Sequence, residues 1–540
     1  MVSGVIQTKS KPFWMGTRRT VRLARGGVFV LLLQLAPAVR GQQPSNSARA
    51  KEQRTARAFD AARENPLELR AFLYGFPKGA DLHYHLVGGV YAETFIRDGA
   101  EDKLCVDLAK LAFVKPPVSR EADGAAPECG DGRVPAEEAF ADQHLYDALV
   151  DAFSMRAFVP SAGVSAHDHF FDAFAKFLAT NPNHGGEWLD EVATRAASQN
   201  EQYLELMDTP DFSHTAQLAK KIGWKDDLRE LRVALLQDGL REDVPVALRH
   251  FQGAEVVRRK LEHCSEPDAA AACRVEIRFI YQVLRGFPKE QVFAQTLLGF
   301  ETASAAPDLV VGINFVMPED GYVSMRDYAV QMKMVKYLHG AYPKVHITLH
   351  AGELAYGLVP LDGLCCHIRL AVEAGAERIG HGVDIMHEDR PYELLNEMAK
   401  KHVMVEINLT SNEVILGLKG DDHPFPIYRK FGVPVALSTD DEGVSRIDLT
   451  HEYVRAAETY DLSYADLKNL ARTGLEHAFL NGQNVWAKED DFALAGSACS
   501  RDTLGSESPS RTCASFLASS EKAREEWELE RRFRAFESAY

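Results

Sequence analysis

Short runs of β-forming residues alternate with helical stretches along most of this chain, and this alternation limits the possible folds more than any other feature. Helical patterns such as 325–339, 362–374 and 391–401 separate the runs. Alternating β and α units predict a parallel sheet, and eight of them predict an α/β fold of the (β/α)8 (TIM) barrel type. An open doubly wound sheet is the competing architecture. The eight runs are 80–86, 203–207, 275–283, 309–315, 345–350, 378–381, 403–408 and 433–439.

The rest of the chain is assigned around this barrel. The long stretch between the first two runs, about residues 87–200, is mostly helical in pattern and predicts an insertion on the first βα loop. Residues 42–70 are polar and rich in Arg and Ala, which indicates a linker that leads into a helix. The barrel domain is expected over 71–515, and a charged amphipathic helix over 516–540.

The N-terminus has the layout of a secretory signal peptide, expected over residues 1–41. A basic stretch without acidic residues precedes an apolar segment at 26–39, and small and polar residues follow. That segment is shorter than the roughly 20 residues of a membrane span, although an uncleaved anchor is the alternative. We therefore expect an exported protein, periplasmic or secreted, without stable membrane association after cleavage.

The cysteines agree with export. Six of the eight form three closely spaced pairs, Cys105 with Cys129, Cys264 with Cys273 and Cys499 with Cys513. Disulfides that close such loops persist in an oxidising compartment. The adjacent Cys365 and Cys366 fall on a helical pattern and are expected to be buried thiols.

The net charge of -17 makes nucleic acid an unlikely class of partner, because an acidic surface repels phosphate backbones. It also gives no reason to expect binding to an anionic membrane. The charge leaves the substrate and the oligomeric state open, and an oligomer is possible.

Residues of the types that bind metal ions, histidine and carboxylates, occur where several of the runs end. In a barrel the catalytic groups come from the C-terminal ends of the strands. His83 and His85 share one face of the first run, because alternate residues of a strand point the same way. The fifth run ends at His350. The glycine at Gly352 allows a bend that brings Glu353 over the site as a candidate proton shuttle.

Two further runs complete the set. The sixth ends with His381 between two glycines, and the eighth leads into Asp440, Asp441 and Glu442. A solvated acidic turn is the alternative for these carboxylates, but clustering them next to a buried strand is costly unless a cation neutralises them. Imidazole and carboxylate ligands with an open position are typical of a catalytic divalent metal, most often zinc.

These segments resemble the adenosine deaminase family of the amidohydrolase superfamily. The matching motifs are PKGADLHYHL at 77–86, HAGE at 350–353, RIGHG at 378–382 and STDD at 438–441, and the resemblance covers about residues 77–480. With the signal peptide and the paired cysteines, the chain looks most like an exported bacterial member or a relative of the secreted deaminase/growth-factor branch.

The resemblance implies one zinc ion per subunit and a small purine nucleoside as substrate. His83, His85, His350 and Asp440 would ligate the zinc, which lowers the pKa of a bound water. Glu353 would protonate N1 of the purine. His381 would orient and deprotonate the water, and Asp441 would hold the resulting hydroxide and bond purine N7. The substrate-binding set that the resemblance implies is His85, Gly352, Met317, Glu319 and Asp441.

The chain departs from the family pattern at two positions. Val87, followed by two glycines, replaces the small polar residue that helps to hold the ribose. Met317 aligns with a glycine whose backbone N–H meets purine N3, which predicts a tighter pocket. Asn408, Ser411 and Asn412 are further candidates to line the pocket.

Three hypotheses for the function follow. The first is hydrolytic deamination of adenosine or 2′-deoxyadenosine to inosine or 2′-deoxyinosine and ammonia. The second is deamination of a modified adenine nucleoside or a nucleotide, although no basic cluster adjoins the motifs to hold a phosphate. The third is a secreted binding or signalling protein on a deaminase scaffold, which would need neither metal ligands nor proton shuttles.

Overall fold

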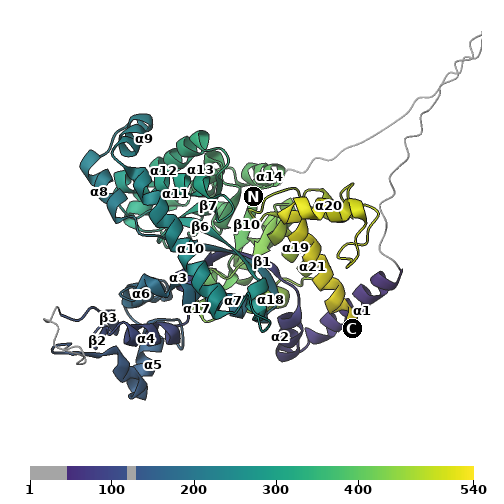
Figure 1. The fold of residues 1–540 in the computed structure, drawn as a ribbon, viewed down its shortest axis with the longest axis horizontal. Helices are drawn as coiled ribbons and strands as arrows, with labels where there is room; N and C mark the ends of the chain where they lie inside the picture. Colours follow the sequence, from purple (N-terminus) through teal and green to yellow (C-terminus); the bar gives the residue numbers. More distant parts are fainter. Residues whose placement is uncertain (1–45, 118–128) are drawn as a thin grey trace, which may run out of the picture. The chain divides into compact units, whose positions relative to one another are not determined.

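The structure of the protein, a computed structural model, describes residues 46–117 and 129–540. The expected signal peptide at 1–41 lies outside the described residues. Eight parallel strands form one sheet in chain order, and all eight β-type runs predicted from the sequence are strands (Figure 1). They are β1 (Gly79–His85), β5 (Glu201–Asp208), β6 (Glu276–Leu284), β7 (Val310–Val316), β8 (His346–Ala351), β9 (Arg378–His381), β10 (Met404–Ile407) and β11 (Val435–Leu437).

The first and last strands meet, which makes the sheet a barrel rather than an open doubly wound sheet. Tyr84 and Asp440 form a parallel bridge between β1 and the residues that follow β11. The backbone N–H of Asp440 donates to the carbonyl of His83 at 2.9 Å, and that of His85 donates to the carbonyl of Asp440 at 3.1 Å. The barrel therefore closes at residues predicted to bind metal.

Helices surround the barrel and bury the outer faces of its strands. Because both faces are covered, strands such as β5 and β10 are buried along their whole length, as parallel strands of an α/β fold are. The helices that follow the second to eighth barrel strands are α8 (Ser213–Ile222), α9 (Leu228–Gln237), α10 (Val244–Leu261), α11 (Lys289–Ala305), α12 (Tyr322–Ala341), α13 (His367–Ala374), α14 (Pro391–Lys401), α15 (Leu409–Leu416), α16 (Phe425–Phe431), α17 (Glu442–Ser445), α18 (Leu449–Thr459) and α19 (Tyr464–Glu476).

The segment between β1 and β5 is mainly helical, as predicted, but it also contains a small antiparallel sheet that the sequence did not indicate. Its three strands have only three residues each, which is too few to show the alternation of polar and apolar residues that indicates a strand. The segment contacts the barrel where Met155 N–H donates to Val444 O at 2.8 Å and where its last-but-one helix packs on α15. Its elements are α3 (Leu86–Gly89), α4 (Ala92–Glu101), β2 (Cys105–Asp107), β3 (Ala112–Val114), β4 (Arg133–Pro135), α5 (Gln143–Ala152), α6 (Ala166–Phe177) and α7 (Gly185–Ser198).

The linker predicted at 42–70 is wrong over its described part. Residues 46–62 form helix α1 (Asn46–Ala62), and a second helix, α2 (Pro66–Gly75), follows it. The polar composition hid three buried side chains, Thr55, Phe59 and Ala62, which anchor α1. It packs against α2, α19 and the C-terminal helix α21 (Glu521–Ser538).

The C-terminal helix is present and belongs to the same compact unit as the barrel. The predicted boundary at 515 falls inside α20 (Arg511–Ser519), and a hairpin of β12 (Trp486–Lys488) and β13 (Asp491–Ala495) precedes that helix. Trp527, Leu529 and Phe533 of α21 are buried. None of the described helices is long and apolar enough to cross a membrane.

The three predicted cysteine pairs are disulfides, Cys105–Cys129, Cys264–Cys273 and Cys499–Cys513. The prediction of buried thiols at Cys365 and Cys366 is wrong, because these neighbours are bonded to each other. The helix that was expected to hold them begins only after them: Cys366 has a φ of +85° and precedes α13.

Candidate metal centre and active site

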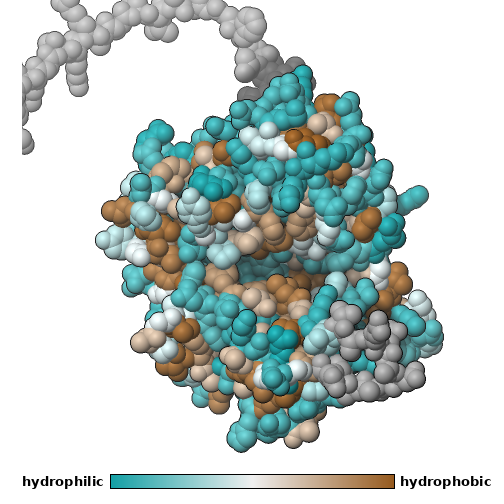
Figure 2. All heavy atoms as spheres, turned by 90° about the vertical axis from the view of Figure 1, so that its left-hand side faces the viewer, coloured by the Kyte–Doolittle hydropathy of each residue, from teal (hydrophilic) through white to brown (hydrophobic). Residues whose placement is uncertain are grey.

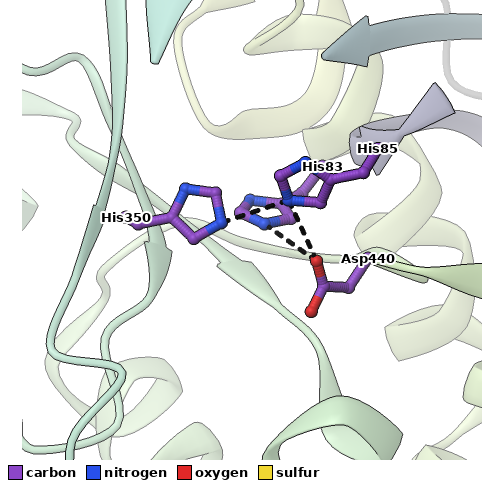
Figure 3. A group of neighbouring side chains, drawn as sticks. All are labelled: His83, His85, His350 and Asp440. Atoms are coloured by element: carbon purple, nitrogen blue, oxygen red, sulfur yellow. Dashed lines mark hydrogen bonds and ion pairs between the residues drawn. The ribbon is translucent and has the colours of Figure 1, made fainter. Parts of the chain in front are cut away.

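Four side chains predicted to bind metal converge at the C-terminal end of the barrel strands (Figure 3). His83 and His85 come from β1, His350 from β8, and Asp440 from the residues after β11. Nε2 of His85 lies 3.2 Å from Nε2 of His350 and 3.2 Å from Oδ1 of Asp440, and Nε2 of His83 lies 3.5 Å from that same oxygen. All four residues are buried.

These separations fit a tetrahedral zinc site. Zn–N and Zn–O bonds of about 2.0–2.1 Å put neighbouring ligand atoms roughly 3.3 Å apart. Two of the atoms involved, His83 Nε2 and Asp440 Oδ1, are buried without a hydrogen-bond partner among the described residues. Buried polar atoms are rarely left unsatisfied, so the donor set has the composition and the unmet bonding capacity of a metal site.

Each histidine is oriented by a polar partner on another strand, and none of these three partners is predicted from the sequence. His83 Nδ1 bonds Glu406 Oε2 at 2.6 Å, His85 Nδ1 bonds Gln282 Oε1 at 2.6 Å, and His350 Nδ1 bonds Asn314 Oδ1 at 2.8 Å. With Nδ1–H donating to an oxygen, Nε2 of each ring is left with a lone pair, as metal ligation requires.

Glu353 lies beside this group, as predicted. Gly352 has a φ of +75°, and the bend it allows brings the Glu353 carboxylate within 3.6 Å of His381 Nδ1. Glu353, His381 and Asp440 also form a close group. Burial raises the pKa of Glu353 well above its usual range, and the charges of Asp440 and Glu319 raise it further. Glu353 is therefore suited to carry a proton at neutral pH.

His381 and Asp441 are buried in the same region. Burial lowers the pKa of His381 to about 3, so its ring is neutral. Burial and the charge of Asp440 raise the pKa of Asp441. Oδ1 of Asp441 and Nε2 of His381 have no hydrogen-bond partner among the described residues, which leaves both free for a bound molecule.

Glu319, predicted to contact substrate, bonds the backbone of the turn that carries Glu353. Its two carboxylate oxygens accept the backbone N–H groups of Gly352 and Glu353 at 3.0 and 2.9 Å. His367 Nδ1 bonds Glu319 at 2.5 Å. Burial opposes its charge, but His367, Arg285 and the backbone N–H of Glu353 together outweigh burial and lower the pKa of Glu319 to about 2. Glu319 therefore positions the turn that carries Glu353.

Met317 lies on the loop after β7, two residues before Glu319, with 37% of its surface exposed. Its φ of +93° is in the left-handed region that favours glycine, which agrees with its alignment with a glycine in the resemblance. Its sulfur accepts the N–H of Gly286 at 3.2 Å. The absence of a side chain at Gly286 leaves room for Met317 in this position, since a Cβ there would stand 2.7 Å from the Met317 methyl group.

The other pocket candidates lie on two helices at the same end of the barrel. Val87 is in α3. Ser411 and Asn412 are in α15, and Asn408 is the residue that directly precedes this helix. Nδ2 of Asn412 lies 2.9 Å from Nδ1 of His381, and Nδ2 of Asn408 lies 3.4 Å from it. These amides therefore contact the catalytic candidate directly.

One face of the molecule is hollowed, and hydrophobic residues border the hollow (Figure 2). Large apolar side chains are also exposed on the loops that follow β6, β7 and β8, at the end of the barrel that holds the candidate site. They are Phe287, Met317, Tyr356, Leu358 and Leu361.

The fold and the site place the chain among the (β/α)8 barrel proteins with a metal-type site at the C-terminal ends of the strands. Residues 169–487, more than half of the chain, match the family model described as adenosine deaminase. The chain belongs to the adenosine deaminase family.

Curated relatives agree over a shorter stretch. The chain is 37% identical over 135 residues to adenosine deaminase of Clostridium perfringens, covering 25% of this chain and 37% of that protein. It is 37% identical over 151 residues to adenosine deaminase of Escherichia coli O157:H7, covering 27% and 42%. The match thus spans about two fifths of the length of these relatives.

Two solved structures are similar over more of the chain at lower identity. Adenine deaminase of Arthrobacter aurescens is 16% identical with a TM-score of 0.47, and the match covers 75% of this chain and 94% of that one. The N6-methyl-AMP deaminase of Arabidopsis thaliana is 20% identical with a TM-score of 0.49, and the match covers 76% and 94%.

Proposed function

We propose that this protein is an enzyme that hydrolyses the 6-amino group of adenosine or 2′-deoxyadenosine, giving inosine or 2′-deoxyinosine and ammonia. One observation carries the proposal: a buried metal-type group of His83, His85, His350 and Asp440 lies against Glu353. The amino group of a purine ring is a poor leaving group. Its removal requires a metal site that activates water and a protonated acid beside that site.

The proposed cofactor is one zinc ion, held by these three imidazoles and the Asp440 carboxylate. When bound, the zinc supplies Lewis acidity that makes water nucleophilic at neutral pH. Membership of the family supports this assignment, and so does the orientation of each Nε2 by a bond at the opposite ring nitrogen.

The remaining residues handle protons and orientation. Water adds to C6 while protonated Glu353 delivers its proton to N1 of the purine. The C6–N bond then breaks. Of the two protons of the water, one restores Glu353 and the other leaves with ammonia. His381 orients the attacking water, and Asp441 bonds the water and purine N7. Glu319 holds the Glu353 turn, and the backbone at Gly352 and Met317 borders the substrate.

A nucleotide substrate finds less support, because the arginines near the site, one directly after β6 and one in β9, are both fully buried. Arg285 is buried and donates to the carbonyls of Phe315 and His350. Arg378 is buried between Glu205 and Glu406. A modified adenine nucleoside remains the alternative substrate, and the exposed apolar loops around the site suit an added alkyl group. A binding protein without turnover would have no use for the protonated Glu353.

We propose further that the protein works outside the cytoplasm, in the periplasm or as a secreted protein. The disulfides of the described chain support this, since such bonds persist in oxidising compartments. Relationship to the secreted growth-factor branch and assembly into an oligomer belong to the same proposal.

The test is a deamination assay on the purified full chain. Zinc-loaded protein should deaminate adenosine, followed by its change in ultraviolet absorbance, and a chelator should abolish turnover until zinc is restored. Glu353→Gln should retain zinc and lose at least about 100-fold in turnover, because an amide cannot supply the proton. The same assay is run with AMP and with N6-substituted adenosines as substrates. Lack of turnover of every purine nucleoside by zinc-loaded protein would favour the binding-protein hypothesis.

A further inference from the structure

A buried chain of hydrogen bonds extends from His381 to a backbone amide of another element. Nδ1 of His381 lies 2.9 Å from Nδ2 of Asn412. Oδ1 of Asn412 lies 3.0 Å from Nε2 of His423. Nδ1 of His423 lies 3.1 Å from the backbone nitrogen of Phe425, in α16. Asn412 and His423 are both buried, so water does not compete for these bonds.

The backbone amide fixes the direction of every bond in this chain. An N–H group can only donate, so His423 Nδ1 accepts from Phe425. Neutral His423 then carries its proton on Nε2 and donates to Asn412 Oδ1. That contact sets the orientation of the Asn412 amide, whose Nδ2 must donate to His381 Nδ1. Amide and imidazole orientations are usually ambiguous, but here the network determines them.

Two further observations agree with this direction. Burial and the nearby Arg455 lower the pKa of His423 to about 3, which keeps its ring neutral. Asn408 presents a second amide nitrogen to His381 Nδ1, at 3.4 Å. Oδ1 of Asn408 has no partner among the described residues, so Asn412 is the donor that makes this ring nitrogen an acceptor. Oε1 of Glu353 lies 3.6 Å from the same nitrogen, which is beyond hydrogen-bond distance.

The other nitrogen of the ring, Nε2, is unpartnered in the described part of the chain, and the ring lies beside two of the candidate metal ligands. Nε2 of His381 is buried and has no hydrogen-bond partner among the described residues. The ring packs edge-on against His83, with centroids 4.8 Å apart, and lies 5.1 Å from the ring of His350. A bound molecule at the metal centre is therefore the available partner for Nε2.

We propose that Asn412 and His423 are positioning residues that hold His381 with its proton on Nε2, so that His381 meets the attacking water as a hydrogen-bond donor. This inference rests on the proposed deaminase function and refines it. A His381 that accepts the proton of the water at Nε2 would first need its own proton on Nδ1. That arrangement would require both amides to turn and the bond from Phe425 N–H to break.

Neutron diffraction from crystals of the deuterated, zinc-loaded full chain tests the proposal directly. We expect nuclear density for deuterium on Nε2 of His381 and on Nε2 of His423, and none on Nδ1 of either ring. Deuterium on Nδ1 of His381 would overturn the proposal. This readout does not depend on which substrate is turned over, so it separates failure of this inference from failure of the proposed function.

Variants of His423 supply the kinetic test. His423→Gln keeps a side-chain N–H that can reach Asn412, whereas His423→Leu is of similar bulk and has none. We expect His423→Leu to lose about 10-fold in kcat, the size of one buried hydrogen bond, with little change in KM, and His423→Gln to recover most of it. Equal losses in both variants would contradict a role for the donor. His346→Leu, at the opposite end of β8, is the matched control and should keep full turnover.

Asn412→Asp tests the direction of the chain. The carboxylate still accepts from His423 but cannot donate to His381, so the proton of His381 should move to Nδ1. We expect a loss of about 100-fold in kcat and deuterium on Nδ1 in the neutron map. A variant of unchanged rate with the proton still on Nε2 would refute the positioning role.

Discussion

Gly88 lies directly against the carboxylate of Asp441. A Cβ atom built on Gly88 would stand 1.6 Å from Oδ1 of Asp441 and 2.5 Å from its Cγ. Gly88 belongs to α3, directly after the histidines of β1, and Asp441 follows the closing strand of the barrel. The absence of a side chain at Gly88 therefore sets where a proposed substrate-binding carboxylate can lie.

Gly88→Ala should displace Asp441 while leaving the barrel folded. Because the contact is far closer than atoms allow, either the carboxylate or α3 must move by about 1 Å or more, and such shifts cost about 100-fold in rate. The measurement is kcat/KM for adenosine together with the melting temperature. The control is Gly253→Ala in α10, which has no atom within 4 Å of its new methyl group. It should gain up to about 1 kcal/mol of stability and keep its rate.

Glu406→Gln should weaken zinc binding. Glu406 accepts from Nδ1 of His83 at 2.6 Å and forms an ion pair with Arg378, whose Nε lies 2.7 Å away. The buried Arg378 lowers the pKa of Glu406 against the effect of burial. Loss of this charge removes the partner that orients His83, and such changes cost about 10–100-fold in metal affinity. Titration of zinc against a competing chelator measures it. The control is Glu377→Gln. Glu377 forms an ion pair with the half-exposed His346, away from the metal centre, so this variant should bind zinc normally.

Much of this site could be predicted because its ligands fall at the ends of strands. His83, His85, His350 and Asp440 lie near or just beyond the C-terminal ends of β-type runs, and the barrel brings such ends together. The residues that orient them could not be found in this way. Gln282, Asn314 and Glu406 are ordinary polar residues within strands, and only the order of strands around the barrel pairs each with its histidine.

The errors outside the site also have physical causes. Residues 46–62 look like a linker because their helix gains its stability from contacts with the far end of the chain. Lys51 Nζ donates to Ser538 Oγ at 2.9 Å, and Arg54 Nε donates to the carbonyl of Tyr540 at 3.0 Å. Adjacent cysteines such as Cys365 and Cys366 fit a helix by pattern, and the bond between them depends on a local backbone conformation that composition does not reveal.

Arg195→Met should destabilise the contact between the insertion and the barrel. Arg195, in α7, donates to Glu442 at 2.8 Å and to the Tyr84 hydroxyl at 2.9 Å. Glu442 is buried and would be left without a counter-charge, which costs about 3–5 kcal/mol. Urea unfolding measures this loss. Adding Glu442→Gln should restore part of the stability, because the unpaired charge is then gone, and a double variant less stable than Arg195→Met would contradict this account.

Glu526 in α21 should make a contribution to the stability of the protein that is lost as pH rises toward 8. Its Oε2 accepts the N–H of Val485 at 2.5 Å, while its Oε1 is buried without a partner among the described residues. Burial raises the pKa of Glu526 from 4.5 to about 8. Below pH 4.5 the carboxyl is protonated in the folded and the unfolded chain alike. Between 4.5 and 8 the folded chain binds the extra proton, so stability is lost as pH rises through this window.

Glu526→Gln should remove this part of the pH dependence, because the amide is neutral at every pH. The free energy of unfolding, measured in urea at pH 6 and pH 9, should fall by about 2 kcal/mol less in the variant than in the parent protein. Glu528→Gln is the matched control on the same helix, because Arg531 and Arg532 outweigh burial and lower the pKa of Glu528. Glu528 is ionised throughout this range, so its variant should keep the slope of the parent. Equal slopes for Glu526→Gln and the parent would show that Glu526 is already charged at pH 6.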